Sequence, residues 1–397
     1  MRRFTRRGFN ALIAGAAVAG PLVRSAFATD PDFTLAVIPD PQYLPTSGAG
    51  CGAYSAVMNY VGNNLNLSVD GSALNIKAVV GVGDCVNTPN SGEGTTAATA
   101  WGLLDTAGIP WITPAGNHDI VPVSGNDLST RNLASNFRTG GFFSFDQRAG
   151  KSYFGGGYGS YGDNYYIKLT IGSWHLLIMS LEYHPRSAVM DWAKGIHDAN
   201  PTYSVIVTTH SYLTSFGNQV ARGSGDIPTN YWGPDGNGYN QGAAPAANSG
   251  TEMWSGWFSG WSRLIMVLSG HWLWRTYYSP SGGWIWKQTP ITSTSGKGQT
   301  VQQIFTNQQD GDTGYDYVSG AQSGNGCTTG NETQHLFFLK FLPSVNKLRA
   351  YSQSVNTGNW IGAAGSMSNA SPVRLFDVDL PAQPASGLLW SPCPVGR

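Results

Sequence analysis

The stretch Val79-Val80-Gly81-Val82-Gly83-Asp84 (VVGVGD) is an apolar, β-branched run that breaks into glycine and a carboxylate. A run of this kind predicts a buried strand that feeds a loop at its carboxyl end. Four further stretches have the same form: VIPDPQ (37–42), TPAGNHD (113–119), VIVTTHS (205–211) and MVLSGH (266–271). Because the carboxyl ends of strands line the ligand crevice of an open α/β sheet, we expect their polar groups to converge. Carboxylate, amide and imidazole groups in one crevice predict a metal site.

Strands and helices alternate on both sides of this stretch. The first part of the chain predicts the order β-α-β-α-β, with elements at 33–39, 54–66, 76–83, 95–107 and 109–114. This order favours a parallel α/β core. A hairpin joined at Gly172-Ser173 follows, and then elements of alternating type: strands 165–171 and 174–181, helix 187–198, strand 203–209, helix 251–262 and strand 264–269. The remainder is expected to be all-β, with strands at 283–288, 301–305, 335–342 and 347–353.

Charged residues make up only 12% of the chain, about half of the typical globular share of roughly 25%. Glycine, asparagine, serine and threonine take their place, which predicts long loops and a neutral polar surface. The sequence contains no basic run or stripe, so we expect no nucleic-acid-binding surface.

Residues 1–28 have the form of an export signal. Four arginines precede an apolar stretch, Ala11–Val23, and Ala26-Phe27-Ala28 is a small-x-small cleavage site. The pair Arg6-Arg7 resembles a twin-arginine signal. Thirteen mostly small residues are too few to span a bilayer, which requires about 20, so no stable membrane anchor is expected. The sequence thus predicts a periplasmic or secreted protein that uses an export machinery.

The four cysteines, Cys51, Cys85, Cys327 and Cys393, show no metal-binding spacing. In an exported protein one or two disulfides are reasonable. Cys51 and Cys85 follow neighbouring predicted strands and could pair, or Cys85 could be a small buried hydrophobe.

The polar groups follow one another in an order that resembles the calcineurin-like metallophosphoesterases. That family's pattern runs Asp-x-His, Gly-Asp, Gly-Asn-His-(Asp/Glu), His and Gly-His-x-His. The matching segments lie between residues 33 and 275: Asp40-Pro41-Gln42, Gly83-Asp84, Gly116-Asn117-His118-Asp119, His210 and Gly270-His271. The resemblance is strongest to the subgroup with Gln in place of the first His. It implies a four-layer α/β/β/α sandwich of two mixed sheets over residues 29–280, with a β-rich C-terminal extension, 281–397, packed on the same domain.

The resemblance also implies a pair of divalent cations. Asp84 would bridge them, and the second cation would be held by Asp84, Asn117, His210 and His271. The first would be held by Asp84 with Asp40 and Gln42. Here the sequence departs from the family, because Gln42 and Leu273 stand where imidazoles are expected. The first site should therefore be weaker and richer in oxygen, which favours Mn, Mg, Ca or Fe over Zn, and one or two ions could bind.

The implied reaction is hydrolysis of a phosphomonoester or phosphodiester by metal-activated water. His118 would stabilise the transition state or protonate the leaving oxygen, and Asp119 would orient its ring. Asp119 could instead be a turn-forming cap. The segment SLEYHPR adds Glu182, His184 and Arg186, which could contact a phosphorylated small molecule or glycan, or could form a strand-to-helix turn.

Two other functions remain open from the sequence. The lost imidazole positions, together with 14 Trp and 18 Tyr, are compatible with a catalytically decayed protein that binds a glycan or cell-surface ligand. A metal-dependent hydrolase of another bond is also possible, since fold does not fix function. The aromatic residues of the predicted helix 251–262 recur at helical spacing, which favours core packing over a carbohydrate platform.

Overall fold

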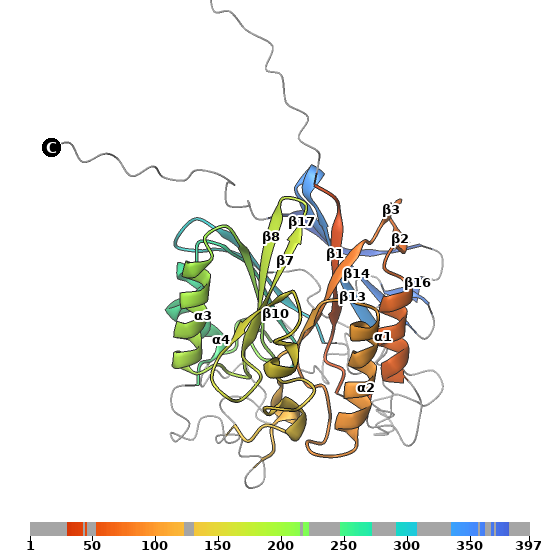
Figure 1. Ribbon diagram of the computed structural model, residues 1–397. Helices are drawn as coiled ribbons and strands as arrows, with labels where there is room; N and C mark the ends of the chain where they lie inside the picture. Colours follow the sequence, from red (N-terminus) through yellow and green to blue (C-terminus); the bar gives the residue numbers. More distant parts are fainter. Residues whose placement is uncertain are drawn as a thin grey trace, which may run out of the picture.

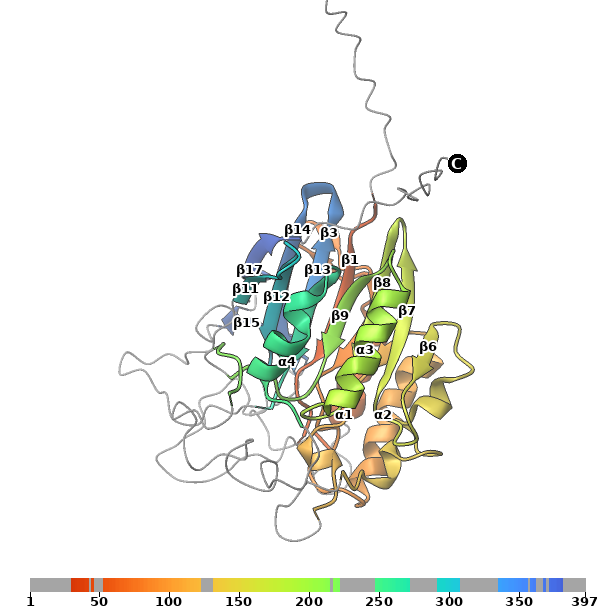
Figure 2. The same cartoon turned by 90° about the vertical axis from the view of Figure 1, so that its left-hand side faces the viewer.

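The computed structural model describes residues 30–42, 44–45, 53–122, 131–214, 217–221, 247–271, 291–307, 335–355, 358–361, 367–368 and 371–380. These residues form two large mixed sheets packed face to face, with helices on both outer faces (Figures 1 and 2). Helices α1 (Ala53–Asn63) and α2 (Glu93–Thr106) cover the first sheet. Helices α3 (Ser187–Ala199) and α4 (Gly250–Gly256) cover the second. The expected four-layer α/β/β/α sandwich is confirmed.

The first sheet combines strands from both ends of the chain. Its order is β16 (Met367–Ser368), β15 (Trp360–Ile361), β14 (Lys347–Ser354), β13 (His335–Leu342), β1 (Phe33–Ile38), β4 (Ile76–Gly81) and β5 (Trp111–Ile112), and β17 (Arg374–Asp379) also pairs with β14. Strands β1, β4 and β5 are parallel. Strand β13 is antiparallel to β1, with Leu339 opposite Leu35. The C-terminal strands thus continue the sheet that contains β1.

The second sheet has the order β11 (Ile291–Thr294), β12 (Thr300–Phe305), β10 (Leu264–Ser269), β9 (Ser204–Thr208), β8 (Trp174–Ser180), β7 (Tyr165–Ile171) and β6 (Phe154–Gly157). Strands β8, β9, β10 and β12 are parallel. The predicted hairpin β7–β8 is confirmed, and Gly172 adopts φ +60° in its turn. A small hairpin joins β2 (Ser68–Val69) and β3 (Ser72–Ala73). Five 3₁₀ turns complete the described elements: Asn117–Asp119, Ser135–Phe137, Phe145–Arg148, Phe258–Gly260 and Pro343–Val345.

The core consists of three apolar clusters, one at each interface between layers. Along β1, alternate residues face opposite sides, so Leu35 packs between the sheets while Ala36 packs under α1 and α2. Because both faces are covered, the central strands are apolar almost throughout. The polar groups of the five motifs therefore follow these strands and do not lie within them.

The structure shortens two predicted elements. Strand β5 contains only Trp111 and Ile112, and α4 ends at Gly256, followed by the 3₁₀ turn that begins at Phe258. Phe258 and Trp261 are fully buried, so core packing of this aromatic segment is confirmed. Several predicted features lie outside the described residues, namely the signal 1–28, the strand 283–288, the boundary at 280, Leu273, Cys51, Cys327 and Cys393. Cys85 is described, and it is a buried free cysteine.

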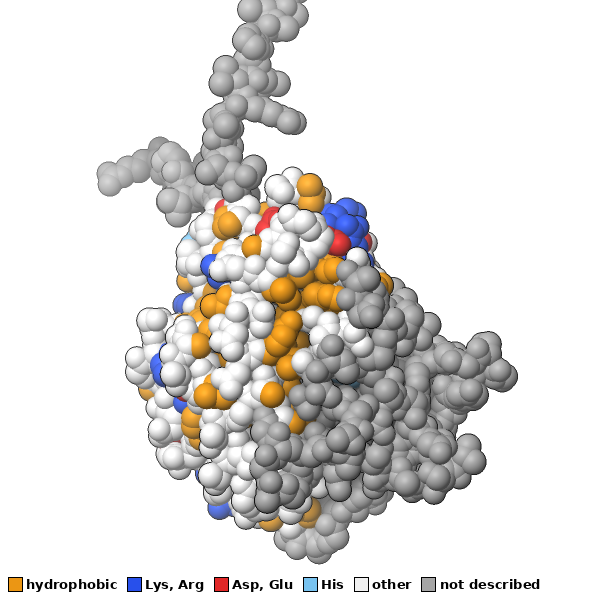
Figure 3. Space-filling view, turned by 90° about the vertical axis from the view of Figure 1, so that its right-hand side faces the viewer, with side chains coloured by type: hydrophobic (Ala, Val, Ile, Leu, Met, Phe, Trp, Pro, Cys, Tyr) orange, Lys and Arg blue, Asp and Glu red, His pale blue; other side chains and the backbone are white. Residues whose placement is uncertain are grey.

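Charged side chains are few on the face shown in Figure 3, and the basic ones that gather at its upper edge lie next to acidic ones. Within the described parts of the chain, no helix is both long enough and apolar enough to cross a membrane.

Candidate metal centre

Five described strands deliver polar side chains to one end of the sandwich, the lower end in Figures 1 and 2. Asp40, Asp84 and Asn117 follow β1, β4 and β5 of the first sheet. His210 and His271 follow β9 and β10 of the second sheet. Ligand atoms of Asp84, His210 and His271 all lie within 4.8 Å of one another. The structure therefore brings groups from both sheets into one cluster.

The backbone is strained at three residues of this cluster. Asp40, Asp84 and His271 have φ values of +56°, +52° and +73°. Side-chain-bearing residues adopt this left-handed region at a cost of about 1–3 kcal/mol each when the position is sparsely populated, and such residues gather at functional sites. All three stand just beyond a strand end.

The atoms around His210 are electron-pair donors, an arrangement suited to binding a cation. Nδ1 of His210 donates to the Val82 carbonyl at 2.7 Å, so in the neutral ring Nε2 carries the lone pair. Nε2 faces the Asn117 oxygen at 3.0 Å, the Asp84 carboxylate at 3.1 Å and Nδ1 of His271 at 3.2 Å. Carboxylate and carboxamide oxygens only accept hydrogen bonds. A cation among these four groups would satisfy all of them, and the donor set of oxygen and imidazole nitrogen suits Mn, Fe or Zn.

The electrostatics of the cluster also favour a cation. Burial, reinforced by the nearby Asp84 charge, raises the pKa of Asp40 to about 8. Burial opposes ionisation of Asp84 too, but His210 and His118 outweigh it and lower the pKa of Asp84 to about 2. Burial disfavours charge on His210, yet the Asp84 carboxylate raises the pKa of His210 to about 9. Without a cation, the Asp84 carboxylate thus favours a proton on Nε2 of His210, and a cation that binds there takes the place of that proton.

The Asp40 carboxylate is already engaged in hydrogen bonds. Its Oδ2 accepts hydrogen bonds from the His271 backbone N–H and from Nδ2 of Asn307, both at 3.0 Å. Asn307 is buried and lies two residues beyond β12, which makes it a further strand-end polar residue. Asn307 was not predicted from the sequence, although Thr306 and Asn307 follow a strand in the same way as the polar groups of the other motifs.

His118 is one of two half-exposed side chains in the cluster, with His271. Its backbone N–H donates to Asp84 Oδ1 at 2.9 Å. Its Nδ1 lies 2.7 Å from the Asn87 carbonyl, and its Nε2 lies 2.9 Å from Nε2 of Gln42. The amide nitrogen of Gln42 also donates to Asn87 Oδ1 at 2.7 Å. His118 is therefore fixed beside the metal ligands with an edge open to solvent.

The predicted contact between Asp119 and the His118 ring was wrong. The Asp119 carboxylate is fully buried and accepts from the backbone N–H groups of Gly116 at 2.8 Å, Cys85 at 3.1 Å and Val86 at 3.3 Å. Nδ1 of His118 instead meets the Asn87 carbonyl. The alternative prediction, that Asp119 shapes the turn, agrees with these contacts.

Tyr183 is a second residue that the sequence analysis missed. It is buried, and its ring centroid lies 5.6 Å from that of His210 and 5.3 Å from that of His271. Its inclined ring contacts both imidazoles of the cluster, which limits their rotation.

Glu182 and His184 are buried, which disagrees with the predicted contact to a substrate. Glu182 forms ion pairs with Arg131 at 3.0 Å and Arg186 at 2.8 Å. His184 packs edge-on against Tyr183, with ring centroids 4.4 Å apart. Arg186 has a side chain that is 26% exposed, so a contact between Arg186 and substrate stays a prediction.

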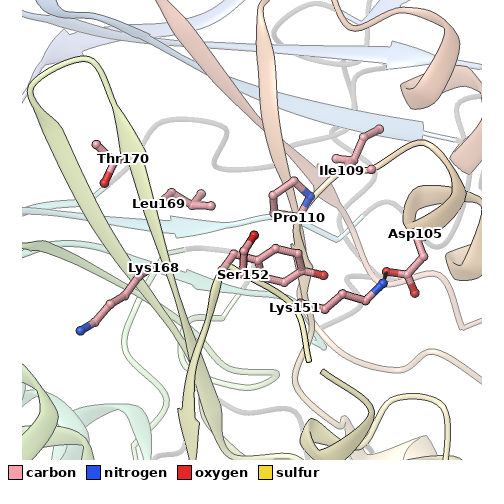
Figure 4. Close-up of a pocket in the computed structure, with 10 residues that line it drawn as sticks. Asp105, Ile109, Pro110, Lys151, Ser152, Lys168, Leu169 and Thr170 are labelled. Carbon is pink, nitrogen blue, oxygen red and sulfur yellow. Dashed lines mark ion pairs between the residues drawn. The ribbon is translucent and has the colours of Figure 1, made fainter. Parts of the chain in front are cut away.

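A separate pocket of about 510 Å³ lies at the opposite end of the strands (Figure 4). Pro110, at the entry to β5, and Thr170, at the far end of β7 from Glu182, both line it. It has three charged residues, Asp105, Lys151 and Lys168, of which Lys151 and Asp105 form an ion pair of 2.9 Å. None of its lining residues belongs to the metal cluster.

No family model and no curated protein matches the chain. Solved structures to which it is similar include the NAD nucleotidase NadN of Haemophilus influenzae, with TM-score 0.36 and 10% identity over 89% of this chain and 51% of that chain. Another is the sulfate thiohydrolase SoxB of Thermus thermophilus, with TM-score 0.31 and 10% identity over 82% of this chain and 43% of that chain. The chain thus spans about half the length or less of these two proteins. The function proposed below rests on the residues of the cluster.

Proposed function

We propose that this protein is a metal-dependent hydrolase that cleaves phosphoester bonds and resembles the calcineurin-like metallophosphoesterases. The observation that carries the proposal is the convergence of Asp84, Asn117, His210 and His271 from both sheets, beside the half-exposed His118. At each of these positions, the residue that the order of motifs indicates also lies in the cluster. A substrate that is a phosphorylated small molecule or glycan is consistent with the polar, open side of the cluster.

A bound cation would supply charge stabilisation at the phosphoryl group and would lower the pKa of water. Asp84, Asn117, His210 and His271 would hold it. His118 would carry a proton on Nε2 to the leaving oxygen, a role for which imidazole is suited near neutral pH. Asp84 connects the two functions, because the same carboxylate faces His210 and accepts the backbone N–H of His118.

A second cation at Asp40 would be bound less tightly. Its carboxylate already accepts two hydrogen bonds, and the amide nitrogen of Gln42 is engaged with Asn87 and His118. We infer that Mn, Mg, Ca or Fe, rather than Zn, would occupy this oxygen-rich position.

The first experiment compares three variants in metal content and in hydrolysis of aryl phosphate mono- and diesters. Asp84→Ala and His271→Ala should each lose both the cation and activity, because each removes a ligand. His118→Ala should retain the cation and lose turnover by about 10²- to 10⁴-fold, the range for a missing general acid.

A matched control is His175→Ala. His175 lies on β8 near its amino end, away from the cluster, where its ring contacts Tyr203. This variant should retain both cation and activity. Full turnover in Asp84→Ala would refute the assignment of the cluster.

The described aromatic residues do not single out the alternative of a decayed glycan-binding protein, because Trp101, Trp111 and Trp261 are fully buried and Trp192, Trp254 and Trp257 are partly buried against the core. Export by a twin-arginine signal stays a prediction, since residues 1–29 lie outside the described chain. N-terminal sequencing of exported material, expected to begin at Thr29, tests it.

A further inference from the structure

Gln42 stands where the related family has a metal-binding imidazole, yet its amide nitrogen is directed elsewhere. Nε2 of Gln42 lies 2.7 Å from Asn87 Oδ1 and 2.9 Å from His118 Nε2. Gln42 is 4% exposed, so these contacts are made inside the protein, where hydrogen bonds are strong.

The contacts of His118 define its tautomer. A backbone carbonyl only accepts hydrogen bonds, so Nδ1 of His118 is the donor to Asn87. In the neutral ring Nε2 then carries the lone pair and accepts from the Gln42 amide. Gln42 and Asn87 thus hold the two nitrogens of one imidazole from opposite sides.

The loop that carries Asn87 is itself fixed by two carboxylates. Asp119 accepts the backbone N–H groups of Cys85 and Val86. Glu93, in the first turn of α2, accepts those of Asn87 and Thr88, both at 2.8 Å. Four successive N–H groups are therefore tied down, which fixes the carbonyl that His118 meets.

We propose that Gln42 is a positioning residue for His118: together with Asn87 it fixes the orientation of the imidazole ring. This is the main role of Gln42, rather than ligation of the first cation. The inference rests on the proposed phosphoesterase function. It explains why glutamine suits this position: an amide offers an N–H to Nε2 and a second N–H to Asn87 at the same time.

In the hydrolysis, the oxygen of water forms the new bond to phosphorus, and the water releases one proton to solvent. The bond from phosphorus to the leaving oxygen breaks, and that oxygen takes the proton from Nε2 of His118. The ring is then neutral, and its Nε2 lone pair accepts from Gln42 as in the structure. A proton from solvent then replaces the Gln42 N–H at Nε2 and restores the acid before the next turnover, while Gln42 keeps its hydrogen bond to Asn87.

The test replaces Gln42 by glutamate, which has the same size, lacks the N–H donors and is a better cation ligand. If Gln42 positions His118, Gln42→Glu keeps its cation and loses turnover by about 10- to 100-fold, the usual effect of a lost supporting contact. The loss should be larger for phenyl phosphate than for 4-nitrophenyl phosphate, because the poorer leaving group depends more on the acid. Asn87→Ala, which frees the Gln42 amide, should act in the same direction.

Gln353→Glu is the control, since Gln353 is 5% exposed and lies on β14, so that it matches Gln42 in burial. It should leave the ratio between the two substrates unchanged. ¹⁵N NMR of the His118 ring gives a readout without turnover: one tautomer with the proton on Nδ1 in the unaltered protein, and loss of that single tautomer in Gln42→Glu. Equal losses on both substrates, or higher activity in Gln42→Glu with tighter cation binding, would overturn the positioning role of Gln42 but not the proposed phosphoesterase function. An inactive but cation-loaded unaltered protein would overturn the proposed function as well.

Discussion

Gly116 shows how closely single residues are fitted around the metal ligands. A Cβ built at this position would lie 2.1 Å from Asp84 Oδ1 and 2.6 Å from the Asp84 backbone nitrogen. The backbone of Gly116 is extended, with φ −96°, so any residue could adopt it. The requirement for glycine is therefore steric, and it comes from the carboxylate that faces His210.

We expect Gly116→Ala to displace Asp84 and weaken cation binding by about 10- to 100-fold, as when a contact that orients a ligand is lost. Titration calorimetry with Mn or Zn measures the change. Gly195→Ala is the matched control, because nothing lies within 4 Å of a Cβ at this position in α3. That control should bind the cation normally and gain up to about 1 kcal/mol in stability from better helix propensity. Equal affinities in the two variants would contradict the steric argument.

Residues that follow an apolar run were predictable from the sequence, because a buried strand can place a polar group only at its end. Asp40, Asp84 and His271 are of this kind. Partners that act through the backbone were not predictable, because every residue has a carbonyl and the sequence does not mark that of Asn87 as different. Glu93 and Tyr183 were missed for a related reason: their contacts depend on how separate elements pack.

At the scale of elements, the Glu182 carboxylate joins three segments. Glu182 follows β8, Arg186 is the N-cap residue of α3, and Arg131 belongs to the segment that follows the His118 turn. The side chains of Glu182 and Arg131 are 0% and 7% exposed, and Asn164 donates to the same carboxylate at 2.7 Å. The Arg131 charge, opposing the effect of burial, keeps the pKa of Glu182 below its usual value.

Glu182→Gln should lower the free energy of unfolding by about 1–3 kcal/mol, because it removes the carboxylate charge that faces Arg186 and one of the two carboxylate charges that face the buried Arg131, which keeps Asp163. Urea unfolding measures this, and the folded variant should still bind the cation. Lys194→Gln breaks the exposed Lys194–Asp198 pair of α3, whose side chains are 50% and 54% exposed, and should cost less than about 1 kcal/mol. If the two variants unfold at the same urea concentration, the ion-pair cluster does not connect these elements as argued.

The elements themselves were predictable to different degrees. The β7–β8 hairpin has a local signal in Gly172-Ser173, and the helices have apolar residues at helical spacing. Strand β5 was predicted longer than it is, because 109–114 is apolar except for Thr113, while only Trp111 and Ile112, between two prolines, pair with β4. An apolar run indicates that a segment is buried. Its strand length depends on how many of its residues form hydrogen bonds with a neighbouring strand.

At the scale of the whole molecule, the position of β13 beside β1 decides the architecture. The alternation of elements predicted a parallel core, but the sequence has no local feature that places His335–Leu342 next to Phe33–Ile38. That pairing joins segments about 300 residues apart, and it depends on which sheet edge the rest of the fold leaves open. The resemblance, rather than periodicity, supplied the two-sheet arrangement.

The metal cluster connects the two sheets, since Asp84 and Asn117 come from the first and His210 and His271 from the second. A cation that binds all four therefore stabilises the folded state as a whole. At a free concentration 100 times its Kd it should add about 2.7 kcal/mol to the free energy of unfolding. Asp84→Ala should show no such gain when the cation is added, which separates specific binding from a salt effect.

We further expect closer to one tightly held cation than two per chain, because Asp84, Asn117, His210 and His271 converge on one point, whereas the Asp40 carboxylate already accepts from the His271 backbone and Asn307. Elemental analysis after dialysis against a chelator gives the number, and calorimetric unfolding of the same samples gives the stability. Removal of the tight ion should lower Tm, whereas millimolar Mn or Mg added to fill the Asp40 position should raise it little. Two ions that survive dialysis would mean that the Asp40 ligands reorient on binding, with Asn307 and Gln42 turning their amide oxygens toward the second cation.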